Sequence, residues 1–261
     1  MEKLSEVNGV VESSKIQLQV NYETLADLFF YPQNEEYKNN IKNIHSYLSK
    51  DIPEAANAMQ PFIDFIKVAS LQEIQELFLR SFDLQAITTL DIGFVLFGED
   101  YKRGKLLVHL NKEHSEAGNI CHTELSDHLP NVLNLIAKMQ DLEIRDEIAS
   151  RLVMPAVDKM ISEFSFEKID KKDVVYKKHQ KVLLEFSKQY RTVYQTLLQA
   201  LFIAMKKDFD YVPENYEELI KNAGNSDNER PSFLSPKKDF ATGEVKDFVE
   251  NIETEMLTEK Q

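Results

Sequence analysis

The sequence has a single cysteine, Cys121, and few turn-forming residues, with 7 glycines and 8 prolines in 261 residues. One thiol cannot form an intramolecular disulfide or supply a multi-thiolate metal or iron–sulfur site, and it suits a reducing compartment. Glycine and proline are well below their usual shares of about 7% and 5%, and this scarcity disfavours sandwiches and barrels, which need many tight turns. Hydrophobic residues still make up 43% of the chain, enough to bury a core.

Long apolar segments are also missing. Met1 to Ser14 contains no apolar stretch of signal-peptide length. The longest apolar run, Leu197 to Met205, is interrupted by Gln199, so we expect neither export nor membrane insertion. Acidic residues outnumber basic ones by 44 to 31, for a net charge of −13, and long-range repulsion would oppose binding to nucleic acid or anionic lipid. The composition predicts a cytoplasmic protein with no nucleic-acid partner.

The motifs of common enzyme classes are absent as well. Neither glycine-rich phosphate loop, Gly-x-Gly-x-x-Gly or Gly-x-x-x-x-Gly-Lys-Ser/Thr, occurs, and there is no Glu-x-x-His of a metal-binding helix bundle. The nearest approach to a ligand cluster is Cys121, His122, Glu124, Asp127 and His128, which matches no familiar metal-site spacing. A nucleophilic Cys121 would lack an orienting partner. We predict no catalysis, no metal and no cofactor, with a metal enzyme at this cluster as the third alternative.

The pattern that is present is helical. Apolar residues recur every three or four positions in several segments, which places them on one face of a helix. The expected helices cover residues 16–31, 37–48, a segment after Pro53, a segment that starts at the capping-box pair Ser70 and Glu73, 101–117, and 183–205. The last would be central, with about six turns. Leu142 to Phe164 also reads as a helix, and Pro155 should kink it near Val153 or Met154.

Four of the seven glycines lie close together, at Gly93, Gly98, Gly104 and Gly118. Gly98 would close one helix and Asp100 would cap the next, while Gly104 would let a neighbour approach and Gly118 would stop a helix. Thr88 to Phe97 is short enough for a buried strand, but no second strand-like segment could pair with it, so we predict a helix. Alternatively, the glycine-rich region and the turn from Asp127 to Pro130 form the lip of a groove that accepts an apolar or amphipathic peptide.

These patterns predict an all-α fold with one helical bundle of about 9 to 11 helices over residues 16–222. Residues 1–15 would be a flexible N-terminus. The polar stretch from Gly224 to Pro231 predicts a linker, so residues 223–261 would be a linker followed by an acidic, partly ordered tail. The tail has one weak amphipathic pattern, Phe240, Val245, Phe248, Ile252 and Met256, and we expect it to order only on a partner.

Four short motifs, in their order and approximate spacing, resemble those of a known protein family. They are Ser81-Phe82-Asp83, Leu96-Phe97-Gly98-Glu99, Tyr101-Lys102-Arg103-Gly104 and Glu124-Leu125-Ser126-Asp127-His128-Leu129-Pro130. Together they resemble the core of the NarJ-type nitrate reductase molybdenum-cofactor assembly chaperones, within the TorD/DmsD group of redox-enzyme maturation proteins. Leu28 to Pro32 is similar to the family's Leu-x-x-Tyr-Pro signature, and weaker similarity continues through Pro155 and Tyr176.

The resemblance implies a TorD-like bundle without catalytic activity. It implies a cytoplasmic chaperone that binds the apo catalytic subunit of a nitrate reductase or a nitrite oxidoreductase-like molybdoenzyme at its N-terminal, leader-like segment. The chaperone would assist insertion of the molybdenum cofactor and would be a monomer or a weak dimer. The alternative is a helical adaptor or regulator with the same fold and no maturation role.

We expect basic leader residues to meet carboxylates through charge-assisted hydrogen bonds and apolar leader residues to meet aromatic side chains. His128 would either satisfy a nearby carboxylate or carbonyl at a helix start or contact the peptide as a titratable group. The complete set of expected peptide-binding residues is Phe78, Phe82, Asp83, Phe94, Glu99, Asp100, Arg103, Glu124, Asp127, His128, Pro130 and Tyr176.

Overall fold

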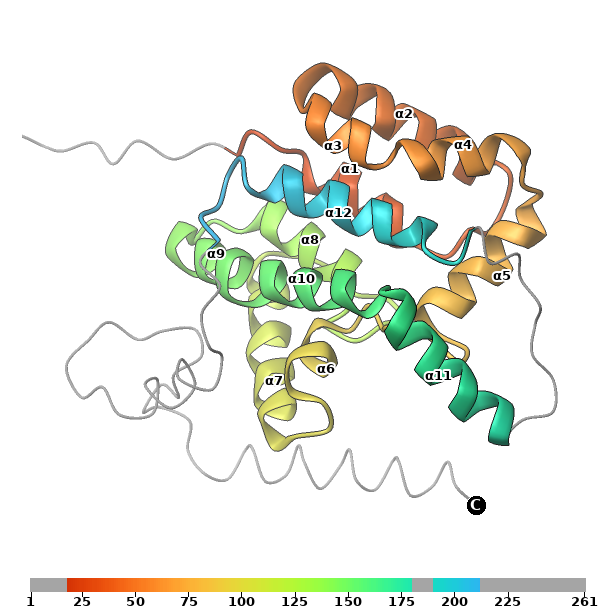
Figure 1. Cartoon of the computed structure of the whole chain (residues 1–261). Coiled ribbons are helices and arrows are strands. Elements are labelled where there is room, and N and C mark those ends of the chain that lie inside the picture. The colour runs from red at the N-terminus through yellow and green to blue at the C-terminus, as the bar shows by residue number, and fades with distance from the viewer. Residues whose placement is uncertain (1–17, 180–189, 212–261) are drawn as a thin grey trace, which may run out of the picture.

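Helices account for all the regular elements in the part of the chain that the computed structural model describes, residues 18–179 and 190–211, with the backbone alone for 173–179 (Figure 1). In these ranges the one β-type pairing is a single bridge between Asp91 and His128. This confirms the predicted all-α, single-domain fold. No described helix combines the length and the apolar character needed to cross a bilayer. The predicted boundaries at residues 15 and 222 lie outside the described ranges.

The described elements are helical segments and turns joined by loops, the longest fully described one being residues 117–128. In chain order they are α1 (Tyr22–Ala26), the 3-10 turn η1 (Asp27–Phe29), α2 (Glu36–Asp51), α3 (Pro53–Ala58), α4 (Gln60–Val68), α5 (Leu71–Phe82), α6 (Ile92–Phe97), α7 (Tyr101–Glu116), α8 (Leu129–Lys138), α9 (Leu142–Ile148), the π-helical turn η2 (Ala149–Val153), α10 (Met154–Glu163), α11 (Phe166–His179) and α12 (Val193–Met205).

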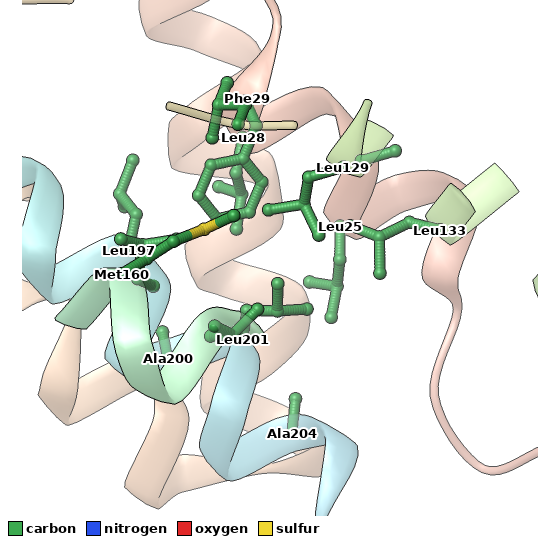
Figure 2. Close-up of a cluster of buried hydrophobic side chains, with 14 of the residues drawn as sticks. Leu25, Leu28, Phe29, Leu129, Leu133, Met160, Leu197, Ala200, Leu201 and Ala204 are labelled. Carbon is green, nitrogen blue, oxygen red and sulfur yellow. The ribbon is translucent and has the colours of Figure 1, made fainter. Parts of the chain in front are cut away.

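The core forms around α12, which runs between α3 and α4 on one side and α10 on the other (Figure 1). Figure 2 shows the cluster where side chains from α1, η1, α8, α10 and α12 meet. Leu197, Leu201 and Ala204 of α12 are fully buried there, as are Leu25 and Leu133. The expected central position of this helix is therefore confirmed. Its apolar residues pack against α3 and α4 and against α10.

Two helices are shorter than their apolar patterns predicted. The described part of the first one begins at Tyr22, capped by the Asn21 side chain, which accepts a hydrogen bond from the Thr24 amide at 3.0 Å. It tightens into η1 and ends before Tyr31, because the residue preceding a proline disfavours the helical region. The last helix begins at Val193, since residues 190–192 form a turn. Its expected beginning at residue 183 lies outside the described ranges.

The predicted capping box is confirmed, and irregular winding is found beside Pro155, where a kink is predicted. The Ser70 amide donates to the Glu73 carboxylate at 2.7 Å and the Glu73 amide donates to Ser70 Oγ at 3.3 Å, which completes the capping box of α5. Pro155 lies at the start of α10, directly after the π-helical turn η2. A proline has no N–H for the carbonyl four residues earlier, so irregular winding at this place has a local cause.

The glycines are partly as expected. Gly98 and Gly118 both have φ of +64° and end helices α6 and α7. Gly104, predicted to allow a close approach, has open space around it, so that prediction is wrong. The close approach occurs at Gly93, where a Cβ would lie 2.6 Å from Asp127 Oδ2 and 3.0 Å from Leu106 Cδ2. This position therefore needs a residue without a side chain.

This difference gives a matched pair of variants. We expect Gly93→Ala to lower the free energy of unfolding by about 1–3 kcal/mol, since the new methyl group overpacks a filled site. Gly104→Ala, at an exposed position in the first turn of α7, should instead be neutral or raise it by up to about 0.5–1 kcal/mol, because glycine costs a helix more backbone entropy than alanine. Urea unfolding followed by circular dichroism measures both. Equal effects would contradict the packing at Gly93.

Candidate functional site

A groove of about 980 Å³ opens on the described part of the surface. One part of its wall is the segment from η1 into the start of α2, and another is the loop from Gly118 to Glu124 ahead of α8. The C-terminal end of α5 and the segment from Thr89 to Asp91 also contribute to its lining. Elements that are distant in sequence therefore meet at one site.

Aromatic and aliphatic side chains form part of the groove's lining and rim. Phe30 and Tyr31 are 41% and 40% exposed, and Ile120 is 71% exposed. Tyr31 stands edge-on to Phe78 with 5.6 Å between ring centroids, and Phe78 continues the cluster to Phe82 at 5.2 Å. The exposed rings rest on a packed aromatic cluster, which gives a partner rigid apolar surface to contact.

The groove also carries uncompensated negative charge. Its lining includes Asp27, Glu36, Asp83 and Glu124, and none of these carboxylates makes a side-chain hydrogen bond or an ion pair with another described residue. Burial raises the pKa of Asp27, since the partly desolvated carboxylate has no cation nearby to offset the cost. Lys138, which also lines the groove, pairs with Glu23 at 3.7 Å and donates to Asn119 Oδ1 at 2.9 Å. The electrostatics favour a cationic partner.

The loop wall is held in place by a chain of buried polar groups. His114 Nε2 lies 2.9 Å from the Ser126 carbonyl, and His114 Nδ1 lies 2.9 Å from Asn119 Nδ2. Asn131 Nδ2 donates to the carbonyls of Leu125 and Cys121 at 2.9 and 3.3 Å. Burial lowers the pKa of His114, which suits a neutral ring that donates from Nε2 and accepts at Nδ1. The groove is therefore formed before any partner arrives.

Next to the groove lies an ion-pair network that joins α6, α7 and the start of α8. The Asp127 side chain is fully buried, and Arg103 grips it through Nε at 2.9 Å and Nη2 at 3.3 Å. Arg103 Nη2 also reaches Asp91 Oδ2 at 3.0 Å, and Asp91 Oδ1 faces His128 Nδ1 at 3.1 Å. The Ile92 amide donates to the Asp127 carbonyl at 2.9 Å, which pins the two segments together.

This pairing corrects the expectation for Thr88 to Phe97. Only Ile92–Phe97 is helical, and Asp91 before it makes the β-bridge to His128. The Leu129 amide donates to the Leu90 carbonyl at 2.9 Å, so the turn ahead of α8 is the pairing partner that the sequence did not reveal. The helix prediction is right for the second half of the segment and wrong for the first half.

The two carboxylates of the network titrate differently. Burial raises the pKa of Asp91, but the hydrogen bond to His128 and the charge of Arg103 outweigh it and hold that pKa below its ordinary value. Burial raises the pKa of Asp127, against the lowering effect of the Arg103 guanidinium. Asp91 is therefore the member whose ionised form the fold favours.

A pH prediction follows for Asp91. A carboxylate with a lowered folded pKa contributes stability above its unfolded pKa of about 3.9 and loses it as the pH falls through the folded value. The drop in unfolding free energy between about pH 5 and pH 3 should therefore be smaller in Asp91→Asn than in the native protein. Urea unfolding across this pH range measures the difference, and identical pH profiles would contradict the role of Asp91.

The structure divides the expected peptide-binding residues into groups. Those that line the groove are Phe78, Phe82, Asp83, Glu124 and His128. Phe94, Glu99 and Asp100 lie on α6 and the turn to α7, outside the groove lining. Arg103 and Asp127 bind each other, and Pro130 is buried at the start of α8. Tyr176 lies on α11, and its side chain is outside the described part.

The expected groove lip is therefore only partly in place. Gly118 and His128 line the groove, whereas Gly93, Gly98 and Gly104 do not. Arg103 binds Asp127 and Asp91, and its guanidinium lies 5.4 Å from the centre of the Phe94 ring, on the α6 side of the network. The network meets the groove at Asp91 and His128, which belong to both.

Sequence reasoning missed several residues of the site, namely Asp27, Phe30, Tyr31, Asp91 and Ile120. A signal existed for Asp91, which is the only charged residue between Asp83 and Glu99. A lone charge in an apolar segment needs a partner when it is buried. Tyr31 belonged to the Leu-x-x-Tyr-Pro signature, but its exposure at the groove rim depends on how η1 ends.

The cluster from Cys121 to His128 does not converge. Asp127 faces Arg103, and His128 faces Asp91. Among the described residues, no group of three or more His, Cys, Asp or Glu side chains is placed to hold a metal ion. A comparison of the sequence with protein-family models gives no match, and a comparison with curated proteins gives none either.

Proposed function

We propose that this protein is a cytoplasmic chaperone that holds the N-terminal, leader-like segment of an apo molybdoenzyme catalytic subunit while the molybdenum cofactor is inserted. The observation that supports this best is the groove, which combines exposed rings at Phe30 and Tyr31 with unpaired carboxylates at Asp83 and Glu124. The four motifs in register with NarJ-type chaperones supply the client class. The client is the catalytic subunit of a nitrate reductase or a nitrite oxidoreductase-like enzyme.

The proposed binding mode uses the two kinds of groove surface together. Apolar side chains of the client segment lie against Tyr31, Phe78 and Ile120, which need no rearrangement because the rings are already packed. Basic side chains of the same segment pair with Asp83 and Glu124, and charge-assisted hydrogen bonds to carboxylates are about twice as strong as neutral ones. No covalent chemistry takes place on the chaperone.

In this account Arg103 and Asp127 act indirectly. They hold α6, α7 and the start of α8 together. Asp91 contacts both Arg103 and His128, so it links this ion pair to the groove wall. The His128 ring stays in contact with the Asp91 carboxylate and presents its other edge among the lining residues. Arg103 and Asp127 are therefore positioning residues for the groove wall.

Co-expression tests the function. The full chain should co-purify with the catalytic subunit of a nitrate-reductase-like molybdoenzyme when molybdenum-cofactor synthesis is blocked, and should release it when the cofactor is supplied. A catalytic subunit that lacks its N-terminal segment should not be retained. Equal retention of the apo and the mature subunit would instead favour the helical adaptor.

A further inference from the structure

Helix α6 carries an apolar surface that the groove does not use. We call it the α6 patch and define it by Phe94, Val95, Leu96, Phe97 and Tyr101. Phe94 is 39% exposed, Tyr101 is 60% exposed and the other three are half-buried. Ile92 and Gly93 of α6 are buried, and Val95, Leu96 and Phe97 also pack partly against the core, while α6 as a whole contacts α10 and α7. Exposed aromatic side chains such as Phe94 and Tyr101 offer apolar area to a partner.

Basic side chains border the α6 patch, although the protein as a whole has a net charge of −13. Lys102 and Lys105 are exposed and neither pairs with a carboxylate among the described residues; Lys105 Nζ lies 5.1 Å from the centre of the Tyr101 ring. Lys159 of α10 donates to the Val95 carbonyl at 3.0 Å. Two carboxylates lie beside these lysines, namely Asp100, which caps α7, and the exposed Glu99. The two unpaired lysines are the groups that would attract an acidic amphipathic partner.

The chain itself contains such a segment. Residues 240–256 have apolar positions at Phe240, Val245, Phe248, Ile252 and Met256, with Glu244, Asp247, Glu250, Glu253 and Glu255 between them. At this spacing the apolar residues would share one face of a helix, and the carboxylates would flank it.

The described chain ends on α10, a helix that contacts α6. Tyr211 donates a hydrogen bond to Asp158 Oδ2 at 3.2 Å and stacks edge-on against Phe202. Asp158 is next in sequence to Lys159, the residue that contacts α6, and α10 lies directly beside α6 (Figure 1). The chain thus leaves the bundle beside α10, and the 28 residues from 212 to 239 are ample to reach the α6 patch.

We propose that residues 240–256 dock on the α6 patch of the same molecule, with their apolar face on Phe94 and Tyr101 and their carboxylates near Lys102 and Lys105. The groove is the wrong site for this segment, because its unpaired carboxylates repel an acidic peptide. Tethering helps the interaction, since a flexible linker holds the two surfaces at an effective concentration of order millimolar. This docking is separate from client binding at the groove.

The absence of tryptophan makes the test simple. In the full-length Phe248→Trp protein, the single indole should emit at a blue-shifted wavelength and be poorly quenched by acrylamide. Quenching should rise several-fold in Phe94→Ser/Tyr101→Ser and in Lys102→Glu/Lys105→Glu, each built in the Phe248→Trp background. If the Phe94→Ser/Tyr101→Ser variant does not fold, the Lys102→Glu/Lys105→Glu variant still tests the proposal. Both lysines are exposed, so replacing them should leave the fold intact. Val68→Ser, at a side chain 74% exposed on α4, is the matched control and should change nothing.

Three outcomes would overturn the proposal. The first is a tryptophan that is quenched equally in the Phe248→Trp protein and in both patch variants. The second is release of the tryptophan by Tyr31→Ala, which would place the segment in the groove. The third is a blue shift that disappears on dilution, which would show that a second copy of the chain, and not the same molecule, supplies the docking surface.

Discussion

Replacing Arg103 with alanine is expected to lower the free energy of unfolding by about 3–5 kcal/mol, the usual cost of removing one partner of a buried ion pair. The substitution leaves the Asp127 carboxylate, whose side chain is fully buried, without its two guanidinium contacts. It also removes the bridge to Asp91 and the stacking on Phe94. Urea unfolding followed by circular dichroism measures the loss.

Companion variants separate charge from geometry. Arg103→Lys keeps the charge but lacks the planar guanidinium, so it should lower the free energy of unfolding by less than Arg103→Ala does. Arg103→Met combined with Asp127→Leu removes both charges and should recover most of the loss, since apolar replacements of a buried pair are often neutral. A loss below about 1 kcal/mol in Arg103→Ala would match a surface ion pair and contradict the positioning role.

The second large effect is expected on client binding. Tyr31→Ala combined with Glu124→Lys should weaken binding of a client N-terminal peptide by about 2–4 kcal/mol, or roughly 30- to 1,000-fold in Kd. The first change removes a rigid aromatic contact, and the second turns an attraction for basic residues into a repulsion. Both side chains are exposed, so the fold should be unaffected. Titration calorimetry measures the affinity.

The chain offers a matched control for this pair. Tyr101→Ala combined with Glu99→Lys makes the same two chemical changes at exposed positions outside the groove lining. It should leave the Kd of the client peptide within a few-fold of the native value. The reverse result, with binding lost in the control and kept in the groove variant, would move the client site to the α6 side, where Glu99, Asp100 and Phe94 lie.

The parts of the fold that sequence reasoning predicted are local. The capping box at Ser70, the irregular winding before Pro155 and the helix stops at Gly98 and Gly118 depend on residues within a few positions of one another. Backbone dihedral preferences and missing donors act over that range. The helical periodicity likewise reports which face of each segment is buried, and the burial along α12 confirms it.

The parts that it did not predict are long-range. Asp127 is 24 residues from Arg103 and 36 from Asp91, and no local pattern indicates that the three converge. The close contact at Gly93 depends on that convergence, because the atom it accommodates is Asp127 Oδ2. Asp127 was for the same reason expected to contact a bound peptide, whereas its side chain is fully buried against Arg103.

The same division between local and long-range features applies to the groove. Its aromatic and acidic residue types were predicted, and five of the twelve expected residues line it. Its location was not, since it depends on where η1 ends, on the left-handed turn at Gly118 and on the side chains of Asn119 and Asn131 that hold the loop. These contacts join residues of different elements, so no local pattern predicts them.

Site-specific photo-crosslinking tests the central claim most directly. A photo-reactive amino acid is placed at Ile120, the groove position that is 71% exposed, in the full chain expressed beside its client without cofactor. The account predicts crosslinks to the N-terminal segment of the molybdoenzyme catalytic subunit and far fewer from the same probe at Val68. Crosslinks confined to the folded body of that subunit, or equal yields from the two positions, would contradict it.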